Sequence, residues 1–211
     1  MLTLNKQNIS IFIIWLFAIS AIIGIYLGYM SWFITKTPLN LMLGAGLLFW
    51  NFPINSSRKI GVWCIAFSIG MLVEIIGVKT GYIFGNYYYG ENLGFKFMGV
   101  PFLIGVNWAV LSFITAAIGS RLTKSFWGSI LLGSCFMLGL DFLLEPLAGV
   151  FDFWYFEDGI VPMQNFIDWF TTAFLLQILI RKTVDFQKTY FSTHLFLSQV
   201  IFFGSCYLIL F

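Results

Sequence analysis

Four carboxylic acid side chains lie within or at the ends of long apolar segments, a setting in which ionisable groups are rare and usually functional. They are Glu74, Asp141, Glu145 and Asp168. Two carboxyl groups that lie close together in a low-dielectric site cannot easily both ionise, so one of them is expected to keep a proton. A protonated carboxyl group beside aromatic rings can act as a general acid.

Helical spacing makes several of these groups neighbours. Asp141 and Glu145 are four residues apart and share one helix face, and Asn165 shares a face with Asp168 and Trp169. We expect Asp141 to be the acid because it lies deeper in its helix. Glu145, one turn nearer the helix end, is then better placed to handle water.

Amide and aromatic side chains at the same level are candidate substrate-binding residues. They are Tyr87, Tyr89, Asn107, Trp108, Trp154, Asn165 and Trp169. The plainer interpretation is that each carboxylate reaches water or pairs with a lysine, while the rings anchor the chain at the membrane interface. Four carboxylates at one depth favour function instead, and we predict that they form one pocket with Asn107 and Asn165.

The composition excludes a soluble globular domain. Hydrophobic residues make up 60% of the chain and charged residues 9%, whereas a soluble domain has about 25% charged residues. A net charge of +2 without a basic stripe argues against nucleic-acid binding. Three cysteines inside apolar runs, one histidine and no phosphate-binding loop give no reason to expect a metal, nucleotide or flavin cofactor.

The elements that must position these residues are seven apolar segments, each read as a membrane-spanning helix. They are Ile9–Phe33, Leu39–Ile54, Ile60–Val78, Val100–Ser120, Phe126–Glu145, Asn165–Ile180 and Tyr190–Phe211. The second and sixth are short for this purpose. We therefore predict an all-α polytopic membrane protein, with residues 1–211 forming a single domain in the cell membrane.

The basic residues predict an orientation in the membrane. With seven spans, eight lysines and arginines fall on the side of the N-terminus and three on the other side. Positive charge is retained in the cytoplasm, so the N-terminus is predicted to be cytoplasmic and the C-terminus outside. The two long aromatic connections, Lys79–Gly99 and Pro146–Gln164, are predicted to lie outside as well.

Several short motifs, taken together, resemble a known family. They are Glu74-x-x-Gly77-x-x-Thr80-Gly81, Gly99-Val100-Pro101 with Trp108, Asp141-x-x-x-Glu145-Pro146, and Pro162-x-x-Asn165-Phe166-x-x-Trp169. This combination is similar to that of the CruF-type membrane carotenoid hydratases. The resemblance covers roughly Gly70 to Phe170, and the first two spans and the last carry no diagnostic residue.

The resemblance implies a cofactor-independent hydro-lyase. Such an enzyme adds water to the terminal 1,2 double bond of an acyclic carotenoid end, of the lycopene or γ-carotene type. The carboxyl groups would supply the proton, and water would capture the tertiary carbocation. The implied partners are a carotenoid in the bilayer, water and other enzymes of carotenoid biosynthesis.

Three other classes compete with this interpretation. A carotenoid or prenyl cyclase shares the protonation step and differs only in how the cation is captured. A transporter or proton relay also uses carboxylates in the membrane, but the inner halves of these segments hold no comparable polar cluster. A retinal-binding photoreceptor is excluded, because no predicted span has an interior lysine for a Schiff base.

Overall fold

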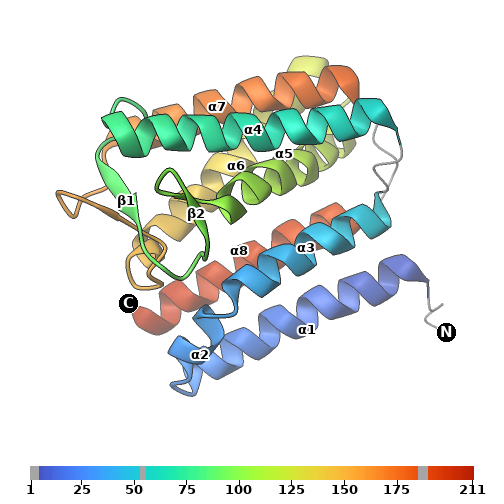
Figure 1. Ribbon diagram of the computed structural model, residues 1–211. Coiled ribbons are helices and arrows are strands. Elements are labelled where there is room, and N and C mark those ends of the chain that lie inside the picture. Colours follow the sequence, from blue (N-terminus) through green and yellow to red (C-terminus); the bar gives the residue numbers. More distant parts are fainter. Residues whose placement is uncertain (1–4, 53–55, 185–189) are drawn as a thin grey trace.

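The computed structural model of this protein describes residues 5–52, 56–184 and 190–211 (Figure 1). Its helices are α1 (Lys6–Tyr26), α2 (Met30–Ile34), α3 (Thr37–Asn51), α4 (Ser57–Thr80), α5 (Phe102–Leu122), α6 (Phe126–Ala148), α7 (Met163–Thr183) and α8 (Phe191–Leu210). Its short strands are β1 (Tyr87–Tyr89), β2 (Lys96–Phe97), β3 (Val100–Pro101) and β4 (Trp154–Phe156). Ile54 and Lys188, which entered the predicted spans and the charge count, lie outside the described residues.

Five of the described helices, α1, α4, α5, α6 and α8, are long and apolar enough to cross a membrane. The chain is therefore a helical, multi-pass membrane protein. Helix α3 has 15 residues, and its length of about 22 Å falls short of the roughly 30 Å of bilayer hydrocarbon. Helix α7 has 21 residues but is not among the five. The count of seven spans and their orientation remain predictions.

The first predicted span, Ile9–Phe33, is wrong at its C-terminal end. Helix α1 stops at Tyr26, and Gly28 follows with φ +89°, a left-handed conformation that breaks the helix. The Tyr29 amide then donates to the Gly24 carbonyl oxygen at 2.9 Å, which turns the chain into the short helix α2. A continuous apolar run therefore conceals a bend, and Gly28 is its one local signal.

The helices form two groups that meet at α5. Helices α4, α6 and α7 pack around α5 on one side, while α3 and α8 contact it on the other, with α1 against α8 (Figure 1). In the apolar stretch of α5 that is long enough to cross a membrane, 78% of the residues are buried, so this helix is the centre of the bundle. Gln177 of α7 fastens to it by donating to Thr115 Oγ1 at 2.8 Å and to the Ser112 carbonyl oxygen at 3.1 Å.

The contact between α5 and α6 gives a first testable prediction. A Cβ atom added at Gly119 would lie 2.4 Å from the Ser129 carbonyl oxygen, whereas one added at Gly139 would meet nothing within 4 Å. The added methyl group of Gly119→Ala forces the backbones of α5 and α6 apart at this contact. We expect it to lower the free energy of unfolding by about 1–3 kcal/mol. Thermal unfolding in detergent should show this loss in Gly119→Ala and not in the control Gly139→Ala. Equal stability of the two variants would contradict this view of the contact.

The two long aromatic connections meet at one end of the bundle. Strand β1 of the first pairs antiparallel with β4 of the second, in the register Tyr87↔Phe156, Tyr88↔Tyr155 and Tyr89↔Trp154. The C-terminal end of α8 lies at this end too, and α1 begins at the opposite end (Figure 1). Both loops thus share one side of the bundle, as the sequence predicts.

Candidate functional site

Glu74 lies near the loop end of α4 at the centre of a hydrogen-bonded cluster. It is 3% exposed, and three side chains donate to its carboxyl group. Tyr87 Oη and Tyr89 Oη donate to Oε2 at 2.5 and 2.7 Å, and Trp108 Nε1 donates to Oε1 at 2.9 Å. Because all three partners are donors, they suit a carboxyl group that acts as an acceptor only. This cluster joins α4, α5 and the loop strand β1.

Tyr87 and Tyr89, in the loop, are held in their protonated form. Burial raises the pKa of both phenols above the ordinary value, and the nearby charge of Glu74 and the hydrogen bonds donated to it raise it further. The folded state therefore favours the neutral phenols. That stabilisation is fully present below the unfolded-state pKa of about 10, and it is lost as the pH rises through the folded-state pKa.

An alkaline titration of phenolate absorbance tests this state. While the protein stays folded, the double variant Tyr87→Phe with Tyr89→Phe should give the same absorbance change near pH 10 as the wild type. In denaturant, where both phenols are free to ionise, the double variant should give a smaller change. A smaller change for the folded double variant would show that these phenols ionise normally.

Asp141 and Glu145 of α6 face Asn165 of α7. Asn165 Nδ2 donates to Glu145 Oε1 at 2.8 Å and, less closely, to Asp141 Oδ2 at 3.3 Å. Trp154 Nε1 of β4 donates to the other oxygen of Glu145, Oε2, at 3.1 Å. One amide group thus joins the two carboxyl groups, which lie one helical turn apart as their spacing predicts.

The surroundings of these two carboxyl groups differ. Both oxygens of Glu145 accept a hydrogen bond, so its ionised form is well supplied with donors. The Asp141 side chain is 3% exposed, and its Oδ1 is buried with no hydrogen-bond partner among the described residues. In so apolar a setting the neutral form of Asp141 is favoured. The pair therefore contains one carboxyl suited to holding a proton and one suited to receiving it.

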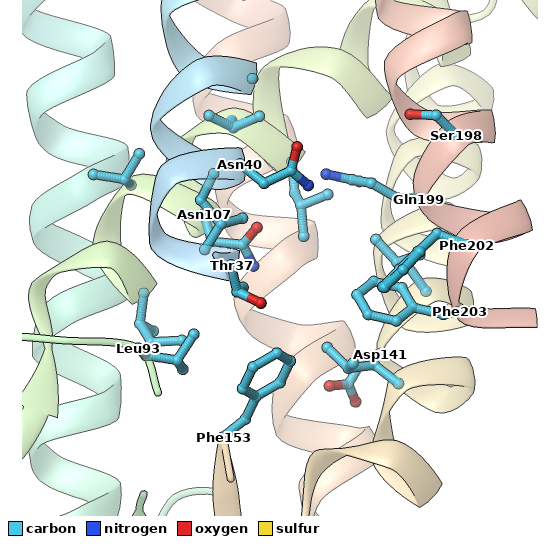
Figure 2. Close-up of a pocket in the computed structure, with 18 of the residues that line it drawn as sticks. Thr37, Asn40, Leu93, Asn107, Asp141, Phe153, Ser198, Gln199, Phe202 and Phe203 are labelled. Carbon is cyan, nitrogen blue, oxygen red and sulfur yellow. The ribbon is translucent and has the colours of Figure 1, made fainter. Parts of the chain in front are cut away.

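Both carboxyl clusters open on one cavity of about 590 Å³. Figure 2 shows Asp141 among the side chains that line it. Ten of the eleven predicted site residues line it, namely Glu74, Tyr87, Tyr89, Asn107, Trp108, Asp141, Glu145, Trp154, Asn165 and Trp169. The indoles of Trp108 and Trp169 stack with ring centroids 4.0 Å apart. The cavity therefore combines aromatic walls with buried carboxyl groups.

Asp168 is the exception, and the structure places it outside this cavity. Its Oδ2 accepts a hydrogen bond from the Phe84 amide at 2.8 Å. Phe84 has a left-handed backbone, with φ +65°, which is strained in a residue other than glycine. The Phe84 ring is buried beside Trp108 and Trp169, so Asp168 helps to hold one wall of the cavity. The prediction of one pocket containing all four carboxylates is wrong for this residue.

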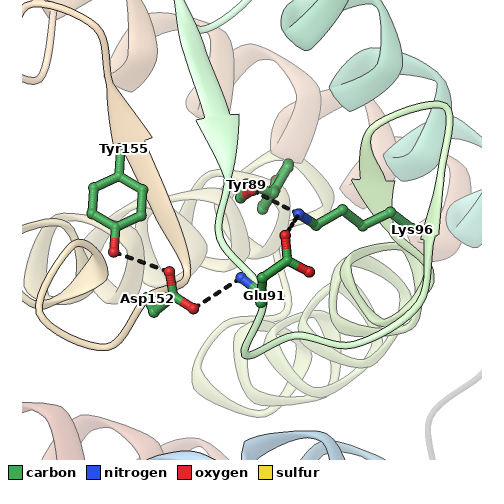
Figure 3. A network of polar contacts seen from close by, with 5 residues as sticks. All are labelled: Tyr89, Glu91, Lys96, Asp152 and Tyr155. Atoms are coloured by element: carbon green, nitrogen blue, oxygen red, sulfur yellow. Dashed lines mark hydrogen bonds and ion pairs between the residues drawn. The ribbon is translucent and has the colours of Figure 1, made fainter.

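A polar network joins the two long connections beside the strand pair (Figure 3). Asp152 accepts from the Glu91 amide at 2.9 Å and from Tyr155 Oη at 3.0 Å. Lys96 Nζ donates to the Tyr89 carbonyl oxygen at 2.9 Å and forms an ion pair with Glu91 at 2.7 Å. These contacts join the two long connections and fix the backbone of β1.

Four polar residues that line the cavity were not predicted from the sequence, and they lie in helices that carry no diagnostic residue. Thr37 and Asn40 of α3 and Ser198 and Gln199 of α8 line it (Figure 2). Apolar side chains of α1 line it as well. The sequence feature that could have indicated these polar residues is an isolated amide residue within an apolar segment, as at Asn40 and Gln199. In the part of the chain that the structure describes, no group of three or more histidine, cysteine or acidic side chains is arranged to hold a metal ion.

The fold and the site define a helical membrane protein with a buried carboxyl and aromatic cavity. The chain matches the family described as Carotenoid biosynthesis protein over residues 36–210. Because this match covers most of the chain, the protein belongs to that family. The resemblance found in the sequence is thus confirmed at the level of the family.

Among curated proteins, the chain is similar to the Bisanhydrobacterioruberin hydratase of Haloarcula japonica. The two are 28% identical over an alignment of 151 residues, which covers 67% of this chain and 50% of that protein. The alignment thus spans about half the length of this relative. No solved structure matches the chain.

Proposed function

We propose that this protein is a carotenoid hydratase that adds water to the terminal 1,2 double bond of an acyclic carotenoid end. The observation that carries the proposal is Asp141 Oδ1, a buried carboxyl oxygen without a partner among the described residues, in a side chain that lines an aromatic cavity. Family membership and the similarity to a curated hydratase support it. Lycopene and γ-carotene are substrates of the proposed type.

The proposed reaction begins with transfer of the Asp141 proton to C2 of the double bond. The π electrons form the new C–H bond, and a tertiary carbocation remains at C1. A water molecule attacks C1 through its oxygen and gives a proton to the Glu145 carboxylate. The product carries a 1-hydroxy group. Return of the proton from Glu145 to Asp141 restores the starting state. Asn165 is hydrogen-bonded to both of these carboxyl groups.

The aromatic walls have a role in this scheme. A carbocation is attracted to the face of an indole ring, more strongly where water is excluded. Trp108 and Trp169 stack in the cavity and Phe84 lies beside them, so apolar rings and not free water surround much of the reacting end. The same cavity must admit one water close to Glu145.

Expression of the full chain in cells that make lycopene tests the proposal. Mass analysis of the extracted pigments should show a gain of one water per hydrated end, and the control Asp141→Asn should leave lycopene unchanged. An isomer of equal mass with altered absorption would support a cyclase instead. Unchanged pigments in both lycopene-making and γ-carotene-making cells, with the protein present in the membrane, would refute the proposal.

A further inference from the structure

The cavity contains a second polar group of side chains that the proposed reaction does not use. Asn40 of α3, Asn107 of α5 and Gln199 of α8 line it from three different helices. Figure 2 shows the amides of Asn40 and Gln199 turned toward each other across the cavity, with Asn107 nearby. Amide groups brought together from separate apolar helices can hydrogen-bond a polar ligand that lies between them.

Gln199 gives the strongest indication of a ligand. Its Oε1 is buried and has no hydrogen-bond partner among the described residues. A buried amide oxygen without a donor is destabilising, and a ligand that supplies an O–H group removes that cost. Apolar side chains border the amide on its own helix, where Phe202 and Phe203 follow within one turn and also line the cavity.

The amide group also lies deeper than the reacting carboxyls. Counted from the loop end, Asp141 is seven residues from the end of α6 and Gln199 is eleven residues from the end of α8. In the view of Figure 2, Gln199 lies farther than Asp141 from Phe153, a residue of the second long connection. A chain whose double bond reaches Asp141 would therefore present another part of its length to Gln199.

We propose that Asn40, Asn107 and Gln199 form a second binding site in this cavity, which accepts a hydroxyl group. The hydroxyl belongs either to an oxygenated isoprenoid chain or to a bound water. Amide groups can both accept from a hydroxyl and donate to it, and so they select it over a hydrocarbon. This inference deepens the proposed function and rests on it for the choice of isoprenoid ligands and for lycopene turnover as a readout.

Binding of two matched probes to the purified full chain tests the site. Farnesol carries a hydroxyl, whereas farnesene has a similar skeleton without one. Quenching of tryptophan fluorescence reports binding, because Trp108 and Trp169 line the cavity. We expect the wild type to bind farnesol about tenfold tighter than farnesene. Gln199→Leu should abolish this preference, and the control Gln164→Leu, at an exposed position outside the cavity, should keep it.

The two sources of the hydroxyl give different results. If the site holds water, the wild type shows no preference for farnesol. Gln199→Leu then lowers lycopene turnover several-fold while the KM for lycopene stays unchanged. Equal binding of the two probes without any turnover defect in Gln199→Leu overturns the inference. A protein that prefers farnesol through Gln199 but converts no carotenoid would retain the second site and refute the proposed reaction.

Discussion

Asp141→Asn is expected to leave the protein folded and able to bind substrate while lowering turnover by a factor of about 10²–10⁴, the usual contribution of a positioned acid. Asparagine has nearly the same shape as aspartate but cannot release a proton to the alkene. Its amide oxygen can still accept the long hydrogen bond from Asn165. The measurement is turnover of lycopene by the purified variant, compared with its substrate affinity and melting temperature.

Asp168→Asn is the matched control for this variant. It makes the same chemical change on α7, and its amide oxygen can still accept the hydrogen bond from Phe84. Since Asp168 lies outside the cavity, we expect nearly normal turnover. Near-normal turnover in Asp141→Asn, with the loss found only in Asp168→Asn or Glu74→Gln, would assign the acid to another carboxyl.

Glu74→Leu is expected to cause the largest loss of stability. It removes the carboxyl acceptor of Tyr87, Tyr89 and Trp108 at once. Tyr87 Oη keeps only the Glu74 backbone carbonyl oxygen, at 3.4 Å, and the buried donors of Tyr89 and Trp108 are left without partners. Each unsatisfied donor costs about 1–3 kcal/mol, so a loss of at least about 2 kcal/mol is expected. For a chain of this size the melting temperature should then fall by at least roughly 4–8 °C. Thermal unfolding in detergent, followed by circular dichroism, measures the change.

Glu157→Leu is the control, because Glu157 is exposed in the second long connection and has no comparable donors among the described residues. It should shift the melting temperature little. If Glu74→Leu melted like Glu157→Leu, the three hydrogen bonds could not be what holds the loop strand β1 against α4 and α5.

The sequence predicted local features of the site well. The segment Phe126–Glu145 starts where α6 starts, and α6 continues only to Ala148. The pairing of Asp141 with Glu145 follows from helical periodicity, which acts over a single turn and needs no knowledge of the fold. Convergence of the ends of α4, α6 and α7 could also be anticipated, because polar groups at one depth in apolar helices tend to meet.

The remaining features depend on tertiary packing. Asn165 and Trp169 face the cavity, but Asp168 points to the Phe84 backbone instead, a difference decided by the left-handed turn at Phe84. Asn40 and Gln199 line the same cavity only because α3 and α8 both pack against α5. No local pattern records which distant helices become neighbours.

The strand pair at the loop end has a consequence for heat inactivation. Tyr89 donates a hydrogen bond to Glu74, and Trp154 donates one to Glu145. Tyr89 and Trp154 are paired with each other in the register of β1 and β4. Loop segments open more readily than the helices they connect. Separation of this one short ladder would release both carboxyl groups from their alignment together. On warming, catalysis should therefore cease at a temperature at which the helical content is still intact.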